Sequence, residues 1–286
     1  MEDIANFHQA VAAIDSGRTI ELFNLLSKHP GLIRYRLPNN EEGYFKDPYL
    51  LWFVADNPIR TGMLSPNILE TTRQLVQIVK REAPDTYQHQ IDYTVGLVAS
   101  GRTARECGVQ IEMIDLLINA GASPDSAMVA LTNGNVDAAQ HLINRGDKLT
   151  LAIAVCLGRI DDINYLASMA SADEKLTALT AAAFYGKENM VKHLLKMNID
   201  PNGFPETGSG FHSHATPLHQ AVSSGSLDCV KLLVEAGAKL NVPDRIYNGT
   251  PLGWAIHMQS DGACDEAMKR NFSVIETFLR TSQQPL

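Results

Sequence analysis

Three histidines lie close together in the segment FHSHATPLH, at positions 212, 214 and 219. Imidazole nitrogens at short spacing are typical ligands of zinc and other transition metals, so a metal centre is the first chemistry to consider here. His212 and His214 belong to a loop-like stretch in which Glu206 is the nearby carboxylate. This ligand set is too small for a metal, so we expect solvated loop side chains, and the sequence predicts no metal site.

Other reactive residues are also isolated. Cys107 follows Arg105, and a neighbouring cation could lower the pKa of its thiol, but a plain surface thiol is the expected outcome. The Gly-Ser-Gly segment at 208–210 is too short to cradle a phosphate, and the adjacent Asp161 and Asp162 would face different ways on a helix. The sequence lacks the G-x-S-x-G, Walker, H-E-x-x-H and EF-hand motifs. We therefore predict a protein that is not an enzyme and has no cofactor.

The composition limits the partners. The chain has 286 residues, of which 45% are hydrophobic and 20% charged, and its net charge is −8. A surplus of acidic residues argues against binding to nucleic acid and favours neutral or basic partners. No apolar run is long enough to span a membrane, the first residues do not resemble a signal peptide, and the four cysteines are widely spaced. We expect a cytoplasmic protein with reduced thiols and no membrane association.

A repeated pattern organises much of the chain. The segment TPLHQAVSSGSLDCVKLLVEAGAKLN at 216–241 aligns without a gap to TALTAAAFYGKENMVKHLLKMNIDPN at 177–202. Segments 149–170 and 126–147 repeat the same apolar residues around a central glycine, and 250–280 repeats them again. A repeat of this length predicts a stack of similar structural units.

Each unit is expected to contain two short amphipathic helices. Gly225 marks the turn between the helices of one unit, and Gly237 follows the second helix, where a left-handed backbone is needed. Val230, Leu233 and Val234 have the spacing of one apolar helix face. One such pair cannot bury its apolar faces alone, so neighbouring pairs must stack.

The segment Thr216-Pro217-Leu218-His219 with Ala221 resembles the T-P-L-H-x-A signature of ankyrin repeats, and 250–252 matches it in part. The resemblance implies an all-α ankyrin-repeat solenoid of about eight helix-turn-helix units with short hairpin fingers. It also implies that His219 bonds to backbone or to a neighbouring threonine. The chain further resembles bacterial ankyrin proteins of unassigned role. We expect one solenoid over 1–286; its repeats are degenerate in 1–124, with units at 5–36, 49–82 and 91–123, and clearer in 125–286.

Several segments interrupt the repeats. In the ankyrin arrangement, the segments 37–48 and 203–215 lie between units, where fingers form. The segments 56–66, 100–110 and 259–271 lie inside units, between the two helices, and would emerge at the opposite end. Because loops often carry function, the loops 56–66, 100–110, 203–215 and 259–271 are an alternative contact region.

The resemblance also implies which side chains face the concave groove. We expect Phe184, Tyr185 and Trp254 to line one exposed apolar patch and to act as anchors whose removal leaves the fold intact. The full set of predicted partner-binding residues is Phe53, Leu97, Ile153, Leu157, Phe184, Tyr185, Gln220, Ser223, Ser224, Trp254, His257 and Met258. For Ile153 and Leu157, burial in the core is an open alternative.

The predicted function is a scaffold that binds a protein or peptide in this groove. Solenoids present extended surfaces, which suit macromolecular partners. One alternative is a small-molecule binder or enzyme that uses the inserted loops, which a closed pocket with perturbed titratable groups would favour. Another is a scaffold that associates with itself.

Overall fold

The computed structural model describes residues 2–39, 42–260, 262 and 264–283, and it divides into two compact units. Unit 1 is Met1–Lys148 and unit 2 is Leu149–Leu286, and each is described by itself. The described residues of both units form helices and no strand; Arg36 and Tyr49 make an isolated antiparallel bridge. The expectation of one solenoid over 1–286 stays a prediction.

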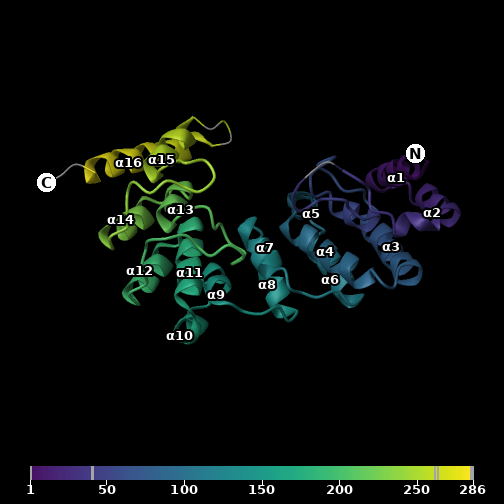
Figure 1. The fold of residues 1–286 in the computed structure, drawn as a ribbon, viewed down its shortest axis with the longest axis horizontal. Helices are drawn as coiled ribbons and strands as arrows, with labels where there is room; N and C mark the ends of the chain where they lie inside the picture. The colour runs from purple at the N-terminus through teal and green to yellow at the C-terminus, as the bar shows by residue number, and fades with distance from the viewer. Residues whose placement is uncertain (1, 40–41, 261, 263, 284–286) are drawn as a thin grey trace. The chain divides into compact units, whose positions relative to one another are not determined.

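Unit 1 contains four successive helix pairs (Figure 1). They are α1 (Glu2–Asp15) with α2 (Thr19–Lys28), the 3₁₀ helix η2 (Leu50–Ala55) with α3 (Ile68–Glu82), α4 (Tyr87–Ser100) with α6 (Gln110–Asn119), and α7 (Ala127–Thr132) with α8 (Val136–Asn144). The short helices η1 (Pro30–Ile33) and α5 (Arg102–Glu106) lie in the connections. The first members α1, η2, α4 and α7 pack side by side, and α3, α6 and α8 form a second layer.

Unit 2 repeats this plan with four more pairs (Figure 1). They are α9 (Leu151–Leu157) with α10 (Ile160–Met169), α11 (Ala172–Phe184) with α12 (Glu188–Lys196), α13 (Pro217–Ser223) with α14 (Leu227–Glu235), and α15 (Pro251–Gln259) with α16 (Glu266–Ser282). The inner helices α9, α11, α13 and α15 pack in chain order, and α12, α14 and α16 pack in the outer layer.

Hydroxyl side chains start the inner helices of unit 2. The Thr150, Thr216 and Thr250 side chains accept hydrogen bonds from backbone amides of the first turns of α9, α13 and α15. Ser171 forms a capping box with Glu174 at the start of α11. These contacts satisfy amides that the first turn of a helix leaves without partners, so a Thr or Ser residue marks the start of each inner helix of unit 2.

The glycines predicted to lie at turns and helix ends have the expected conformation. Gly225 has φ +68° between α13 and α14, and Gly237 has φ +89° just after α14. The amide of Ala238 bonds to the carbonyl of Leu233, which closes the end of α14. Asn198, which aligns with Gly237 in the repeat at 177–202, also has a positive φ of 58°.

The first helix of the second unit-1 pair differs from the expectation of an α-helix. Residues 50–55 form a 3₁₀ helix in which all six side chains are buried. An amphipathic α-helix has one buried face, whereas this segment (Leu-Leu-Trp-Phe-Val-Ala) has no polar face to expose. The helix ends at Asp56, whose φ is +47°.

The inserted segments also differ from simple fingers. The described residues of 37–48 and 203–215 form loops without strands. The ends of 37–48 are joined by the antiparallel bridge of Arg36 and Tyr49 and by the bond from the Leu37 amide to the Pro48 carbonyl. The segment 100–110 contains α5, and the second half of 259–271 is the start of α16; residues 261 and 263 lie outside the described chain. In the segment 56–66, the buried Asp56 carboxylate accepts bonds from the amides of Arg60, Thr61 and Gly62 and from the Thr103 hydroxyl, so this loop is tied to the start of α5.

Candidate binding surfaces

The predicted groove residues fall into two groups. The expectation of groove exposure is wrong for three side chains, which are at most 6% exposed: Phe53, Leu97 and Gln220. A fourth, Ile153, is 2% exposed, which agrees with the alternative of burial in the core. Seven are intermediate in exposure and one, His257, is exposed. The seven are Leu157, Phe184, Tyr185, Ser223, Ser224, Trp254 and Met258.

Packing explains why Phe53 is buried. Its ring makes edge contacts with the rings of Phe7 at 5.6 Å and Phe45 at 5.3 Å, and the Arg60 guanidinium lies 4.9 Å from its centre. Phe45 comes from the loop that precedes η2, so this loop folds back over the inner helices. A linear pattern of repeat positions does not reveal that a neighbouring loop covers one of them.

A similar covering occurs in unit 2. Phe184, the last residue of α11, contacts Tyr185 at 5.1 Å, and from the segment 203–215 it contacts Phe211 at 5.5 Å and His212 at 4.7 Å between ring centres. The His212 ring in turn contacts the His214 ring, with ring centres 5.8 Å apart. We call the set completed by Trp254 the Phe184 cluster: Phe184, Tyr185, Phe211, His212, His214 and Trp254.

His214 joins the two ends of this cluster, because its ring centre lies 6.2 Å from that of Trp254. Ring contacts thus connect Phe184 to Trp254 through His212 and His214, and the segment 203–215 covers part of this aromatic surface. Its role as a binding patch stays a prediction. That segment was expected to be a solvated loop, yet its Phe211 is 4% exposed. An aromatic residue directly before two histidines in an insertion was the available signal.

The burial of His212 has an electrostatic consequence. Burial, together with the neighbouring His214, lowers the pKa of His212 to about 4, so its imidazole is neutral at pH 7. Its Nε2 atom is buried without a hydrogen-bond partner. Within the described residues, no three His, Cys, Asp or Glu side chains are arranged to hold a metal ion.

Trp254 is held by a loop that follows α14. Its indole Nε1 donates to Asp244 Oδ2 at 3.0 Å, and its ring makes an edge contact with His219 at 5.0 Å. These contacts argue against the expectation that removal of Trp254 leaves the fold intact, because its side chain is hydrogen-bonded to Asp244 and packs against His219.

Asp244 organises the loop at 243–249, which we call the Asp244 loop. Its carboxylate is 3% exposed and accepts bonds from the amides of Ile246 at 2.9 Å, Tyr247 at 2.6 Å and Gly249 at 2.8 Å, in addition to that from Trp254. Burial opposes ionisation, but these donors outweigh it and hold the Asp244 pKa at about 2. An ionised carboxylate thus fixes the loop at neutral pH.

The Asp244 loop displays apolar side chains. Ile246 is 62% exposed and Tyr247 is 76% exposed, although both amides are bonded to the same carboxylate. A side chain added at Gly249 would come within 3.0 Å of Trp254 Cδ1 and 3.1 Å of Asp244 Oδ2, so the close approach requires glycine. Sequence analysis did not single out this loop, although its Pro-Asp and Asn-Gly pairs are turn signals.

His219 has the structural role that the repeat pattern implies. Its Nε2–H donates to the Gly249 carbonyl at 3.0 Å, which leaves Nδ1 to accept from the Thr216 hydroxyl at 2.8 Å. The ring therefore joins the start of α13 to the end of the Asp244 loop, and it is buried. This prediction is confirmed.

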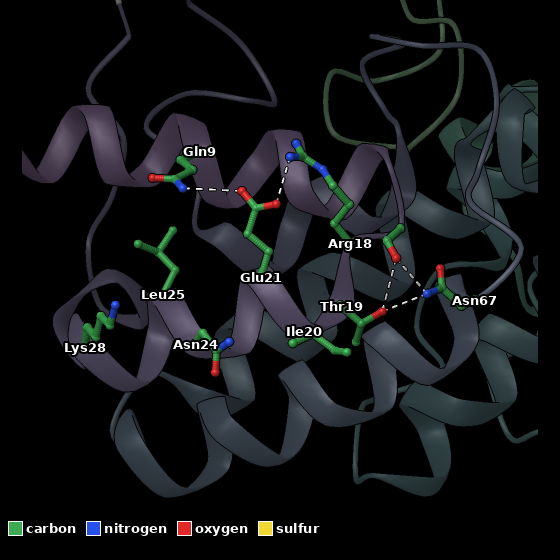
Figure 2. Close-up of a pocket in the computed structure, with 10 residues that line it drawn as sticks. Gln9, Arg18, Thr19, Ile20, Glu21, Asn24, Leu25, Lys28 and Asn67 are labelled. Atoms are coloured by element: carbon green, nitrogen blue, oxygen red, sulfur yellow. Dashed lines mark hydrogen bonds and ion pairs between the residues drawn. The ribbon is translucent and has the colours of Figure 1, made fainter.

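A hollow of about 730 Å³ in unit 1 lies beside α2 (Figure 2). Its carboxylate, Glu21, accepts bonds from Arg18 at 2.8 Å and from Gln9 at 3.3 Å. Asn67 donates to the Thr19 hydroxyl, as Figure 2 shows, and its side-chain nitrogen also donates to the Gly17 carbonyl. These polar groups satisfy one another, so we assign no ligand to this hollow.

A family model described as ankyrin repeats (3 copies) matches residues 151–244 and 203–266. Residues 151–266 are similar to ankyrin repeats. Together with the all-helical pairs described above, this match confirms the predicted fold class, an all-α ankyrin-repeat solenoid.

Two curated relatives are eukaryotic ankyrin-repeat proteins. An ankyrin repeat-containing protein of Schizosaccharomyces pombe is 41% identical over 64 residues, which is 22% of this chain and 28% of that protein. Ankyrin repeat and SOCS box protein 16 of Homo sapiens is 31% identical over 124 residues, 43% of this chain and 22% of that protein. The matched regions span less than a third of either relative.

A solved structure, the ankyrin repeat domain of human ASB11, aligns with 78% of this chain and 99% of its own, with 18% identity and a TM-score of 0.36. Ankyrin repeats are generally scaffolds for protein–protein interaction, and proteins that carry them are generally not enzymes. No helix in the described part of the chain is long and apolar enough to cross a membrane.

Proposed function

We propose that this chain is a non-enzymatic scaffold that binds a protein or peptide through unit 2. The observation that carries the proposal is the Asp244 loop, which holds Ile246 and Tyr247 exposed on a rigid backbone. Exposed apolar side chains on an ordered loop mark contact surfaces, and a fixed tyrosine buries a large area with little loss of entropy.

The proposed surface also includes accessible residues at the ends of the inner helices of unit 2. Tyr185 is half-buried at the end of α11, and Ser223 and Ser224 at the end of α13 are partly exposed. His257 and Met258, on the last turns of α15, are also accessible. We propose that a partner contacts the Asp244 loop and this row of inner-helix ends, so that the predicted groove and one loop act together.

The proposal also covers the charge of the partner, the location of the protein and the type of ankyrin protein. The net charge of −8 favours a neutral or basic partner, and we propose a cytoplasmic location. We also propose the bacterial ankyrin type, on the sequence resemblance alone. The alternatives, a scaffold that associates with itself and a small-molecule binder or enzyme that uses the inserted loops, make different predictions in the following experiment.

The test begins with affinity capture by the intact chain and quantitative mass spectrometry. For the captured partner, Tyr247→Ala should weaken binding by about 2 kcal/mol, roughly thirtyfold. Tyr165→Ala is the matched control, because Tyr165 is 67% exposed on α10, away from the Asp244 loop in sequence. Equal affinities of the two variants would contradict the proposal.

Two further readouts separate the alternatives. Sedimentation over a concentration series should show one species. If a dimer instead accumulates as the concentration rises, and Tyr247→Ala abolishes it, the result would favour self-association. A small metabolite that raises the unfolding temperature of the chain without any protein partner would favour the inserted-loop alternative.

A further inference from the structure

Unit 1 contains a second hollow, of about 600 Å³, on the inner side of the helix stack. The loop before η2 supplies Tyr44, α4 supplies His89, Asp92 and Tyr93, and the segment that leads into α7 supplies Asp125. Leu97, which was predicted to face the groove, lies at this hollow but is 3% exposed. A volume of this size accommodates a long side chain rather than a folded segment.

The aromatic residues of this hollow are held in place by their neighbours. The Tyr93 ring stacks on Trp52, with ring centres 4.1 Å apart and an angle of 26°. The Tyr93 hydroxyl donates to the Tyr44 carbonyl, and the Tyr44 hydroxyl donates to Asn57 Oδ1 at 3.0 Å. Two tyrosines from segments far apart in the sequence are therefore fixed beside each other before any ligand binds.

The charge of the hollow is negative. Two of its lining residues are aspartates and none is lysine or arginine. Asp92 Oδ1 accepts from the Ser123 amide at 2.7 Å and from the Gln88 amide nitrogen at 2.8 Å, which orient the carboxylate without neutralising it. The Asp125 side chain is exposed and has no ion-pair partner within the described residues.

We propose that this hollow binds an arginine side chain of the protein partner. A guanidinium is planar, stacks on aromatic rings and forms forked hydrogen bonds with carboxylates, so it fits a hollow that presents tyrosines and two aspartates. A lysine ammonium matches the charge but not the flat, forked shape. The inference rests on the proposed function, because it assumes a protein ligand, and it names the chemical group that unit 1 recognises.

Nuclear magnetic resonance tests the proposal on the intact chain. The probes are N-acetyl-arginine methylamide, the corresponding lysine compound, and the citrulline compound, which has nearly the same shape and no charge. We expect arginine to shift the amide signals of Gly96, Ser100 and Asn133, which lie at this hollow. We expect binding at least about fivefold weaker for lysine and citrulline, and weaker binding of arginine at higher salt.

Two matched variants test whether the Asp125 carboxylate binds the arginine. Asp125→Asn should weaken arginine binding about fivefold, the size expected for one partly solvated ion pair. Asp137→Asn, at an exposed aspartate in the first turn of α8, makes the same change of charge and should leave binding unchanged. Amide spectra that match those of the original protein outside the hollow will show that both variants fold.

Three results would overturn the proposal: no arginine shifts at this hollow, equal binding of citrulline or lysine, or equal losses in Asp125→Asn and Asp137→Asn. These results would leave the proposed function intact if the captured partner still required Tyr247. If arginine binds here while the partner is insensitive to Tyr247→Ala, the inference survives as an arginine site and the unit 2 surface is wrong.

Discussion

Replacing Asp244 by asparagine tests how the exposed loop of unit 2 is held. The substitution keeps the shape but removes the charge that four N–H donors share, three from backbone amides and one from Trp254. The carboxyl pKa is lowered from 3.8 to about 2, and 1.36 kcal/mol per unit converts this shift to about 2 kcal/mol of folding free energy. We expect Asp244→Asn to reduce the free energy of unfolding at pH 7 by about that amount.

The same reasoning fixes a pH dependence. Because the folded pKa is below the unfolded one, the contribution of Asp244 is complete above pH 4 and is lost as the pH falls towards 2. The difference between the original chain and Asp244→Asn should therefore shrink by about 1 kcal/mol between pH 7 and pH 3.

Urea unfolding followed by circular dichroism at 222 nm, at several pH values, measures both effects. Asp161→Asn is the control, since Asp161 is an exposed residue in the first turn of α10 and should change stability by less than about 0.5 kcal/mol. An unchanged unfolding free energy in Asp244→Asn, or a difference that grows as the pH falls, would refute the reasoning.

Two further predictions concern the repeats and the loop that covers Phe184. Gly237→Val should lower the free energy of unfolding by about 1–2 kcal/mol, because the backbone there has φ +89°, although the added atoms would meet open space. Asn198→Gly should be neutral or slightly stabilising. An unchanged urea midpoint in Gly237→Val would contradict the predicted backbone strain. His212 is a half-buried neutral ring with a pKa of about 4 against 6.5, so its contribution to stability should be complete above pH 6.5 and fall between pH 6.5 and 4. His212→Gln should flatten that part of the stability curve, and an identical slope would contradict this prediction.

The repeat pattern was enough to place the helix pairs and their turns. A glycine such as Gly225 indicates a left-handed backbone at its own position, and Thr216 indicates the start of a helix. Both effects act within a few residues, so they can be predicted from the local sequence. The sequence therefore predicted the fold of both units well. It did not predict the 3₁₀ helix at 50–55, whose form depends on burial from all sides.

The candidate surface was less predictable, because exposure depends on loops that lie outside the repeat. Phe45 covers Phe53, and the segment 203–215 covers Phe184, through contacts that no local periodicity encodes. Trp254 was predicted to line the groove, and the hydrogen bond that ties it to Asp244 could not be read from the repeat pattern. The exposed Tyr247 was missed because the turn that displays it has no place in the helical pattern.

Hydrogen exchange of the intact chain with and without its captured partner tests the central claim most directly. If unit 2 binds through the Asp244 loop and the neighbouring inner-helix ends, the partner should slow exchange at 243–249 and at 184–186, where α11 ends. Exchange along the outer helix α10 should stay unchanged. Protection confined to α10 or to the outer layer, with none at 243–249, would contradict this account.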